Sequence, residues 1–276
     1  MSAPPIRSVA YAPHPRLAPY ITAYLTTAID VAVDRSTIDL FPVGHAVLSV
    51  AFDEQPLLLD GTRPVTSKLN LTGQLTRYHQ LTVRGQYSYA YALFRPFGAW
   101  QVLGVPQAGL ADDFADVRTL VPGPATEAAY ARLRALPVAG PDAIAALDEW
   151  LLALLDRPPA RDTARVRAAV ELLEARAGAA TSAELAAVAD LSAPRLVRAF
   201  KQQVGLPPKQ YARVVRFVAA YRTLREAAPH HPDWPALVER YAYFDQAHFI
   251  KEFKGFFGYT PSQVHRSLLN IADHVV

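Results

Sequence analysis

The sequence contains no cysteine and a single methionine among its 276 residues. Without cysteine there is no disulfide framework, no iron–sulfur cluster, no cysteine-ligated zinc and no thiol nucleophile. Long apolar runs are absent as well: no stretch reaches 18 uninterrupted apolar residues, and the opening MSAPPIRSVAYAPHPRLAPY has no run of signal-peptide length. We therefore expect a cytoplasmic protein that does not span a membrane.

The composition is that of a globular protein with two domains. Hydrophobic residues make up 51% of the chain and charged residues 19%, which is enough for a core and too little charge for a disordered chain. A chain of 276 residues exceeds one typical domain of about 100 to 200 residues. The proline-rich DRPPARD at 156–162 marks a boundary, so we expect domains at 1–160 and 161–276.

Acidic residues are scarce in one part of the chain. The net charge is +3 overall, and it divides into −2 for residues 1–160 and +5 for residues 161–276. Between Leu191 and Arg225 the sequence has eight lysines and arginines and no acidic residue. Such a segment indicates either a polyanionic partner or a solvated basic helical face, and charge alone does not decide between them.

The N-terminal half has the pattern of an antiparallel β domain. From Ser36 to Phe94, runs such as HAVLSVAF (45–52) and LTVRGQYSYAYALF (81–94) are rich in β-branched and aromatic residues. Turn-forming pairs such as Asp60-Gly61 separate these runs. We expect a sheet or a barrel, which either holds a ligand or serves only as structure.

Two helices are expected after the strands, at about 125–136 and 141–155. Proline at the start of the second helix costs nothing, because the first helical N–H groups have no partner within the helix. The second helix has one apolar stripe, which packs either within the subunit or against a second copy of the chain. A homodimer through these helices is therefore a hypothesis.

The sequence indicates no catalytic residue, no metal site and no cofactor. His14, His45 and His79 are the histidines of the N-terminal half, and they lie far apart without metal-ligand spacing. The sequence has no nucleophile elbow, no Walker loop and no dinucleotide-binding glycine motif. We expect a protein that is not an enzyme, and the residues that would bind a ligand are unknown.

The C-terminal half repeats itself at an offset of 53 residues. LSAPRLVRAFKQQVGLPPKQYAR begins at Leu191 and FDQAHFIKEFKGFFGYTPSQVHR begins at Phe244, and they align without a gap. Phe200 aligns with Phe253, and Gly205 aligns with Gly258. The two units are therefore expected to share one structure.

The sequence pattern of each unit predicts the second helix of a helix-turn-helix. Ser192 and Asp245 are good N-cap residues, so helices are expected at 193–204 and 246–257, each ended by a glycine. A spacing of three to four residues predicts that one stripe of each helix faces the core: Leu196, Phe200 and Val204 in the first, and Phe249, Phe253 and Phe257 in the second.

Further helices complete two bihelical units. The segments 181–189 and 233–241 are expected to be the first helix of each unit, and 208–228 is expected to be one long helix between the units. About 20 residues at 1.5 Å per residue span roughly 30 Å. One turn of B-DNA is about 34 Å long, so this helix could present two recognition helices to successive major grooves.

The string YFDQAHFIKEFKGFFGYTPSQV closely resembles the signature of the AraC/XylS family of bacterial transcription regulators, and the likeness extends over about 163–268. The segment FRPFGAWQVLGVPQAGLADDFADV resembles, less closely, the cupin-like sensor domain of one AraC subgroup. The resemblance implies an α+β protein with a cupin-like antiparallel β domain and an all-α double helix-turn-helix domain. It implies sequence-specific binding of double-stranded DNA, an effector in the N-terminal domain, and RNA polymerase as a partner if the protein is an activator.

The resemblance also implies the roles of individual residues. Arg198 and Lys251 take the main base-reading positions, where a cation can contact guanine. Apolar groups beside them can meet thymine methyls, and several polar or basic residues are better placed for phosphates. The apolar neighbours are Pro194, Val197, Ala247 and Ile250; the phosphate contacts are Arg195, His248, Lys201, Lys209 and Lys254; and Gln246 opens the second helix.

The sequence departs from the family pattern at two points. The turn glycine usual in each unit is replaced by Asp190 and by Ala242, so neither turn has the residue that adopts positive φ most easily. The apolar residues of the reading face offer no hydrogen bonds, so we expect DNA shape to contribute more of the sequence specificity. They also leave an alternative open: a module that binds a small molecule or a partner protein and no longer reads DNA.

Overall fold

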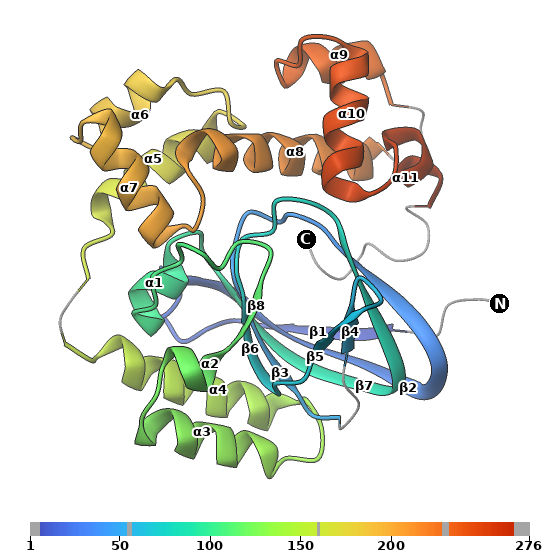
Figure 1. Ribbon diagram of the computed structural model, residues 1–276, viewed down its shortest axis with the longest axis vertical. Coiled ribbons are helices and arrows are strands. Elements are labelled where there is room, and N and C mark those ends of the chain that lie inside the picture. The colour runs from blue at the N-terminus through green and yellow to red at the C-terminus, as the bar shows by residue number, and fades with distance from the viewer. Residues whose placement is uncertain (1–5, 54–56, 159–160, 228–231, 268–276) are drawn as a thin grey trace.

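The computed structural model describes residues 6–53, 57–158, 161–227 and 232–267, and Figure 1 shows a β-rich part below a helical part. The first part contains eight strands. They are β1 (Ile6–Tyr11), β2 (Ile21–Leu40), β3 (Val47–Ala51), β4 (Leu57–Leu59), β5 (Arg63–Val65), β6 (Leu69–Thr72), β7 (His79–Phe94) and β8 (Phe114–Asp116).

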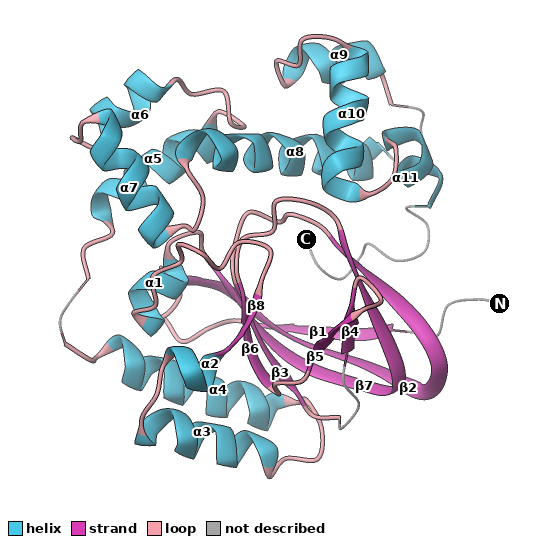
Figure 2. Cartoon of the chain, in the orientation of Figure 1, coloured by secondary structure: helices cyan, strands magenta, loops and turns pink. Residues whose placement is uncertain are grey.

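The strands form one antiparallel sheet in the order β1-β2-β7-β3-β6-β8, with β4 pairing with both β5 and β7. Strands β2 and β7 pair along almost their whole length and carry the curvature of the sheet. Register shifts interrupt their pairing between Ile21 and Ala23 and between Ile29 and Ser36. Figure 2 shows these two long strands sweeping round the side of the β part.

The antiparallel fold class is confirmed, but the expected start of the β region at Ser36 is wrong. Strand β1 and the first half of β2 lie before that residue. In β2 the inward Tyr24 is followed by Leu25, Thr26 and Thr27, so apolar and polar residues do not alternate strictly. The strand is held by pairing with β1 on one side and β7 on the other, which are contacts that a local pattern does not report.

The two faces of the sheet have different tasks. Ala90, Ala92 and Phe94 of β7 belong to a buried core under the helices, whereas the intervening Tyr91 and Leu93 line a cavity on the other face. The same alternation holds in β3, where Leu48 faces the core and Ser49 the cavity. Because neighbouring side chains of a strand point to opposite faces, one sheet supplies both a packed core and a hollow.

Four helices accompany the sheet: α1 (Gly98–Leu103), α2 (Val117–Leu120), α3 (Pro124–Arg134) and α4 (Pro141–Leu155). The expected helix at 141–155 is confirmed with the same bounds, and the helix expected at 125–136 lies at α3. Ile144, Leu147 and Leu151 of α4 are buried in the core of this subunit. Their apolar stripe therefore has a partner within the chain.

The helical part contains α5 (Ala164–Ala175), α6 (Ser182–Val188), α7 (Ala193–Gln203), α8 (Pro208–Ala227), α9 (Trp234–Arg240), α10 (Gln246–Phe257) and α11 (Pro261–Ser267). Figure 1 shows α6 and α7 at one end of the long helix α8, and α9 and α10 at the other. The double helix-turn-helix arrangement is confirmed. The long helix agrees with the predicted 208–228 to within its last residue, Ala228, which lies outside the described residues.

A second core, separate from the one under the sheet, holds the helical part together. It includes all six residues predicted to face inward on α7 and α10. Because each part has its own buried cluster, we propose domains at 1–160 and 161–276. Within the described ranges, no helix has both the length and the apolar character that crossing a membrane requires.

The β domain contacts the C-terminal ends of both α7 and α10. The backbone N–H of Gln107 donates to the carbonyl of Gln202 at 2.8 Å, and that of Tyr78 donates to the carbonyl of Gly255 at 3.3 Å. Phe41 packs between the domains, with its ring 4.6 Å from that of Phe257. The N-terminal ends of the two helices are thus the ends left for another partner.

Candidate nucleic-acid interface

Each candidate recognition helix is fixed to α8 by its apolar stripe. Phe200 of α7 packs against Tyr211 with ring centroids 6.1 Å apart, and Phe253 of α10 packs against Phe217 at 5.2 Å. On α10 an ion pair adds to the packing, because Arg213 of α8 donates to the buried Glu252 at 2.8 Å. Both recognition helices are therefore anchored to α8, whose 20 residues span about 30 Å.

The predicted contact residues lie on the outer faces of these helices. All of those on α7 are exposed, as is Lys209 on the first turn of α8. The exposed residues on α7 are Pro194, Arg195, Val197, Arg198 and Lys201, and those on α10 are Gln246, Ala247, His248, Lys251 and Lys254. Each helix thus carries its cations on the side opposite to its phenylalanines.

Ile250 differs from the other predicted contact residues. Its side chain is half-buried and packs against the core of the helical domain. Val197, at the equivalent position of α7, keeps 38% of its surface exposed. The apolar surface that remains free is therefore larger on α7 than on α10.

The two recognition helices begin with different caps. The carboxylate of Asp245 accepts a hydrogen bond from the backbone N–H of His248 at 2.7 Å, as its N-cap position predicts. Ser192 occupies the N-cap of α7 with extended backbone, so the predicted helix start at Ala193 is confirmed, although the Ser192 side chain makes no capping hydrogen bond. Proline near the start of α7 supports this helix start instead, because it has no N–H to cap.

Both turns adopt positive φ without glycine, at 49° for Asp190 and 52° for Ala242. After the turn the units diverge. The backbone N–H of Leu191 donates to the carbonyl of Ala186, and that of Tyr243 donates to the carbonyl of Val238. These two hydrogen bonds are 52 residues apart in the sequence, whereas the recognition helices are 53 residues apart. The second unit therefore has one additional residue before its helix, which is Phe244.

Phe244 is 90% exposed at the N-terminal end of α10, on the same helix end as Gln246 and His248. Such exposure of a phenylalanine beside a basic helix is unusual for a residue that only meets water. The gapless 53-residue repeat gives no sign of this extra residue, whereas the turn residues Asp190 and Ala242, which are 52 apart, do indicate it.

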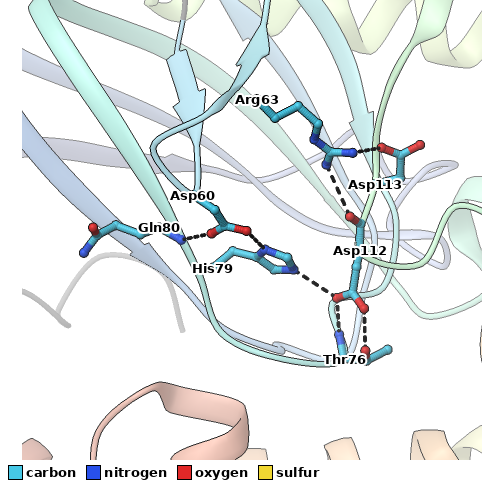
Figure 3. A network of polar contacts seen from close by, with 7 residues as sticks. All are labelled: Asp60, Arg63, Thr76, His79, Gln80, Asp112 and Asp113. Carbon is cyan, nitrogen blue, oxygen red and sulfur yellow. Dashed lines mark hydrogen bonds and ion pairs between the residues drawn. The ribbon is translucent and has the colours of Figure 1, made fainter.

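A polar network ties together the loops of the β domain that lie next to α10 (Figure 3). The buried imidazole of His79 lies between two carboxylates, 2.8 Å from Asp60 and 3.3 Å from Asp112. The hydrogen bond with Asp112 and the charge of Asp60 raise the pKa of His79 against the opposing effect of burial. The neighbouring Tyr78 packs on Tyr259, at a ring distance of 5.9 Å.

Two family models match parts of the chain. A family model described as a helix-turn-helix domain matches residues 185–267, and a model described as a domain of unknown function (DUF6597) matches residues 9–116. No curated protein matches the chain.

Solved structures of ToxT from Vibrio cholerae are similar over most of the chain. One is 10% identical, with a TM-score of 0.48, and covers 89% of this chain and 98% of its own. A second, bound to an unsaturated fatty acid, is 8% identical with a TM-score of 0.49 and covers 92% of this chain and 97% of its own.

The match at residues 185–267 spans α7 to α11 and includes both recognition helices. The signature in α10, the two units at the ends of α8 and this family match agree with one another. Residues 185–267 therefore form a helix-turn-helix domain that carries the AraC/XylS signature, and the chain is a DNA-binding regulator of transcription.

Proposed function

We propose that the chain reads a specific DNA sequence by placing α7 and α10 in successive major grooves. The observation that carries this proposal is the pair of exposed basic helix faces at the two ends of α8. The length of α8, about 30 Å, supports a match to one turn of B-DNA. The N-terminal halves of α7 and α10 would enter the grooves, since their C-terminal ends contact the β domain.

In this proposal the roles of the side chains follow from their chemistry. Arg198 and Lys251 donate to guanine O6 and N7, and Val197 meets thymine methyls. Arg195, Lys201 and Lys209 contact phosphates, which position the protein and carry no sequence information. Because apolar residues occupy much of the reading face, DNA shape contributes part of the specificity.

The β domain is proposed as the sensor, with a small-molecule effector in its cavity. A homodimer, and a contact with RNA polymerase if the protein activates, belong to the same proposal. A regulator that binds bacterial chromosomal DNA acts in the cytoplasm.

The test is a selection of bound fragments from a random pool of double-stranded DNA, using the full chain at near-physiological salt. We expect two short enriched boxes separated by about one helical turn, roughly 10 base pairs. Recovery of a single box would contradict the use of both helices. Recovery of no motif from a folded protein would contradict sequence reading.

The second candidate function, docking of a partner protein on the same face, is favoured by one observation: Val197 remains exposed between cations. Salt dependence separates the two functions. Each phosphate neutralised by the protein lowers the slope of log K against log salt by about 0.9 on B-DNA. A steep slope on DNA supports the main proposal, whereas weak, flat binding to every DNA supports docking of a protein.

A further inference from the structure

The β domain encloses a cavity of about 440 Å³, which is in the size range of small-molecule sites. Its wall is the face of the sheet opposite to the core under the helices, and it includes Val47, Ser49, Asn70 and Leu93. The far side of the cavity is closed by the second helix-turn-helix unit, through Phe257, Tyr259 and Val264. A molecule in this cavity would therefore touch both domains.

No lysine or arginine lines this cavity among the described residues. The one carboxylate in the wall is Asp39, and its oxygen accepts hydrogen bonds from the Tyr78 hydroxyl at 2.6 Å and from Gln80 at 3.3 Å. An anionic ligand would meet no lysine or arginine in the described wall itself and would be repelled by Asp39. Because a buried charge without a partner is costly, the wall selects against carboxylates and phosphates.

Three tyrosines of β7 form an aromatic ladder along the wall. The rings of Tyr87 and Tyr89 stack at 4.4 Å and those of Tyr89 and Tyr91 at 5.9 Å, and the hydroxyls of Tyr87 and Tyr91 are hydrogen-bonded to each other. Burial raises the pKa of all three hydroxyls, so they stay neutral. The ladder offers flat apolar surface to a ligand with an aromatic or aliphatic body.

Several polar side chains line the cavity, among them Ser49, Asn70 and Thr72, and His45 is the one with a buried ring nitrogen left without a partner among the described residues. That nitrogen is Nε2. Burial, with a smaller contribution from the nearby charge of Arg222, lowers the pKa of His45 to about 4. The ring is thus neutral at pH 7, and the hydrogen bond with the backbone of Val43 leaves Nε2 as an acceptor.

We propose that this cavity binds an uncharged, mainly apolar small molecule with a hydroxyl group that donates to Nε2 of His45. A ligand hydroxyl can donate a hydrogen bond to the unpaired Nε2 of His45, whereas a carboxylate has no proton to donate to it. The inference deepens the proposed sensor role of the β domain by naming its ligand class. Since Tyr259 and Val264 form part of the wall, ligand occupancy acts on the end of α10 and so on DNA binding.

Three matched compounds test the ligand class: 2-naphthol, 2-methoxynaphthalene and 2-naphthoate, titrated calorimetrically into the full chain at pH 7. The first donates a hydrogen bond, the second cannot, and the third is charged. We expect 2-naphthol to bind about tenfold tighter than the ether, because one hydrogen bond in a buried site is worth on that order. We expect 2-naphthoate to bind more weakly than either.

The variant His45→Leu should lose the preference for 2-naphthol over its ether, whereas His45→Gln, which keeps an acceptor, should retain part of it. Equal or tighter binding of 2-naphthoate, or no binding of any of the three compounds, overturns the inference. If His45→Leu does not fold, the ranking of the three compounds on the unchanged chain decides the question.

The coupling to DNA is measured separately, as affinity for the selected DNA with and without saturating 2-naphthol. We expect a change of about fivefold or more, in the range typical of linked sites, and a smaller change in Tyr259→Ala. An unchanged affinity overturns the coupling. Failure of the ligand-free chain to select DNA overturns the proposed function instead, and leaves the ranking of the three compounds as it stands.

Discussion

At the scale of single residues, α7 and α10 show how one helix divides its side chains between a core and a partner. Phe200 and Phe253 are fully buried, while Arg198 and Lys251, two positions earlier on each helix, are exposed. A step of two residues turns a helix by about 200°, so the two tasks fall on opposite faces. Variants on the exposed face should therefore change binding and leave folding intact.

Arg198→Ala and Lys251→Ala should each lower the affinity for the specific DNA by about 1–3 kcal/mol and relax the sequence preference at one base pair. The control is Lys209→Ala, which should weaken all DNA sequences alike and reduce the salt slope by about one. Fluorescence anisotropy on specific and scrambled duplexes measures both effects. An unchanged ratio of specific to nonspecific binding in Arg198→Ala would show that the reading face is assigned wrongly.

Phe244→Ser should weaken DNA binding without lowering the melting temperature, because this side chain is 90% exposed in the free protein. Partial burial of a phenylalanine against DNA is worth about 1 kcal/mol, or somewhat less than tenfold in affinity. Thermal unfolding and DNA titration of the same sample give the two readouts. A fall in melting temperature with unchanged DNA affinity would mean that Phe244 has a structural role.

At the scale of elements, the two glycines at the end of α10 have opposite requirements. Gly258 ends the helix at a φ of +83°, and a Cβ there would lie 2.8 Å from the ring of Tyr78. Gly255 lies within the helix, and a Cβ there would meet no atom within 4 Å. The close approach of the β domain to α10 thus depends on one glycine and not on the other.

Gly258→Ala should reduce the free energy of unfolding by about 1–2 kcal/mol from the backbone alone, and by more if Tyr78 is forced to move. Gly255→Ala should raise it by about 0.5–1 kcal/mol, since alanine is the better helix former at an open position. Denaturant unfolding of both variants makes the comparison. Equal effects in the two variants would refute the close contact between Tyr78 and α10.

At the scale of the whole molecule, His79 links the loops of the β domain that lie next to the DNA-binding domain. Its pKa is raised in the folded state, so the stability that it contributes is complete below the pKa of the unfolded chain, about 6.5, and is lost as pH rises through the folded value. Asp60 and Asp112 have lowered pKa values, and their contribution is lost only in acid. His45 acts in the opposite direction, because its lowered pKa costs stability as pH falls from about 6.5 towards 4.

The difference in unfolding free energy between the unchanged chain and His79→Gln should therefore be largest near pH 6 and should shrink as pH rises through the raised pKa of His79. Taking a difference removes the contribution of His45, which both proteins share. Urea unfolding of both proteins at several pH values measures this difference in unfolding free energy. A difference that is constant from pH 6 to 9 would show that His79 does not titrate between the two carboxylates.

Much of the helical domain could be predicted from the sequence because its signals are local. The bounds of α10 and α4 agree with the prediction, since an N-cap, a terminal glycine or an initial proline acts within a few residues of its own position. The stripe of phenylalanines likewise determined which face of each recognition helix is buried. The extra residue at Phe244 was missed because a gapless repeat does not report where a turn lengthens.

The sequence by itself determined the two classes of structure, the doubled helix-turn-helix unit and the basic character of its outer face. Tertiary structure alone decided that β1 and the first half of β2 are strands, that His79 lies between two aspartates, and that His45 and the tyrosine ladder share a cavity with Tyr259. The physical reason is distance along the chain. Caps, glycines and helical periodicity act between near neighbours, whereas strand pairing, ion pairs and cavity walls join residues that only folding brings together.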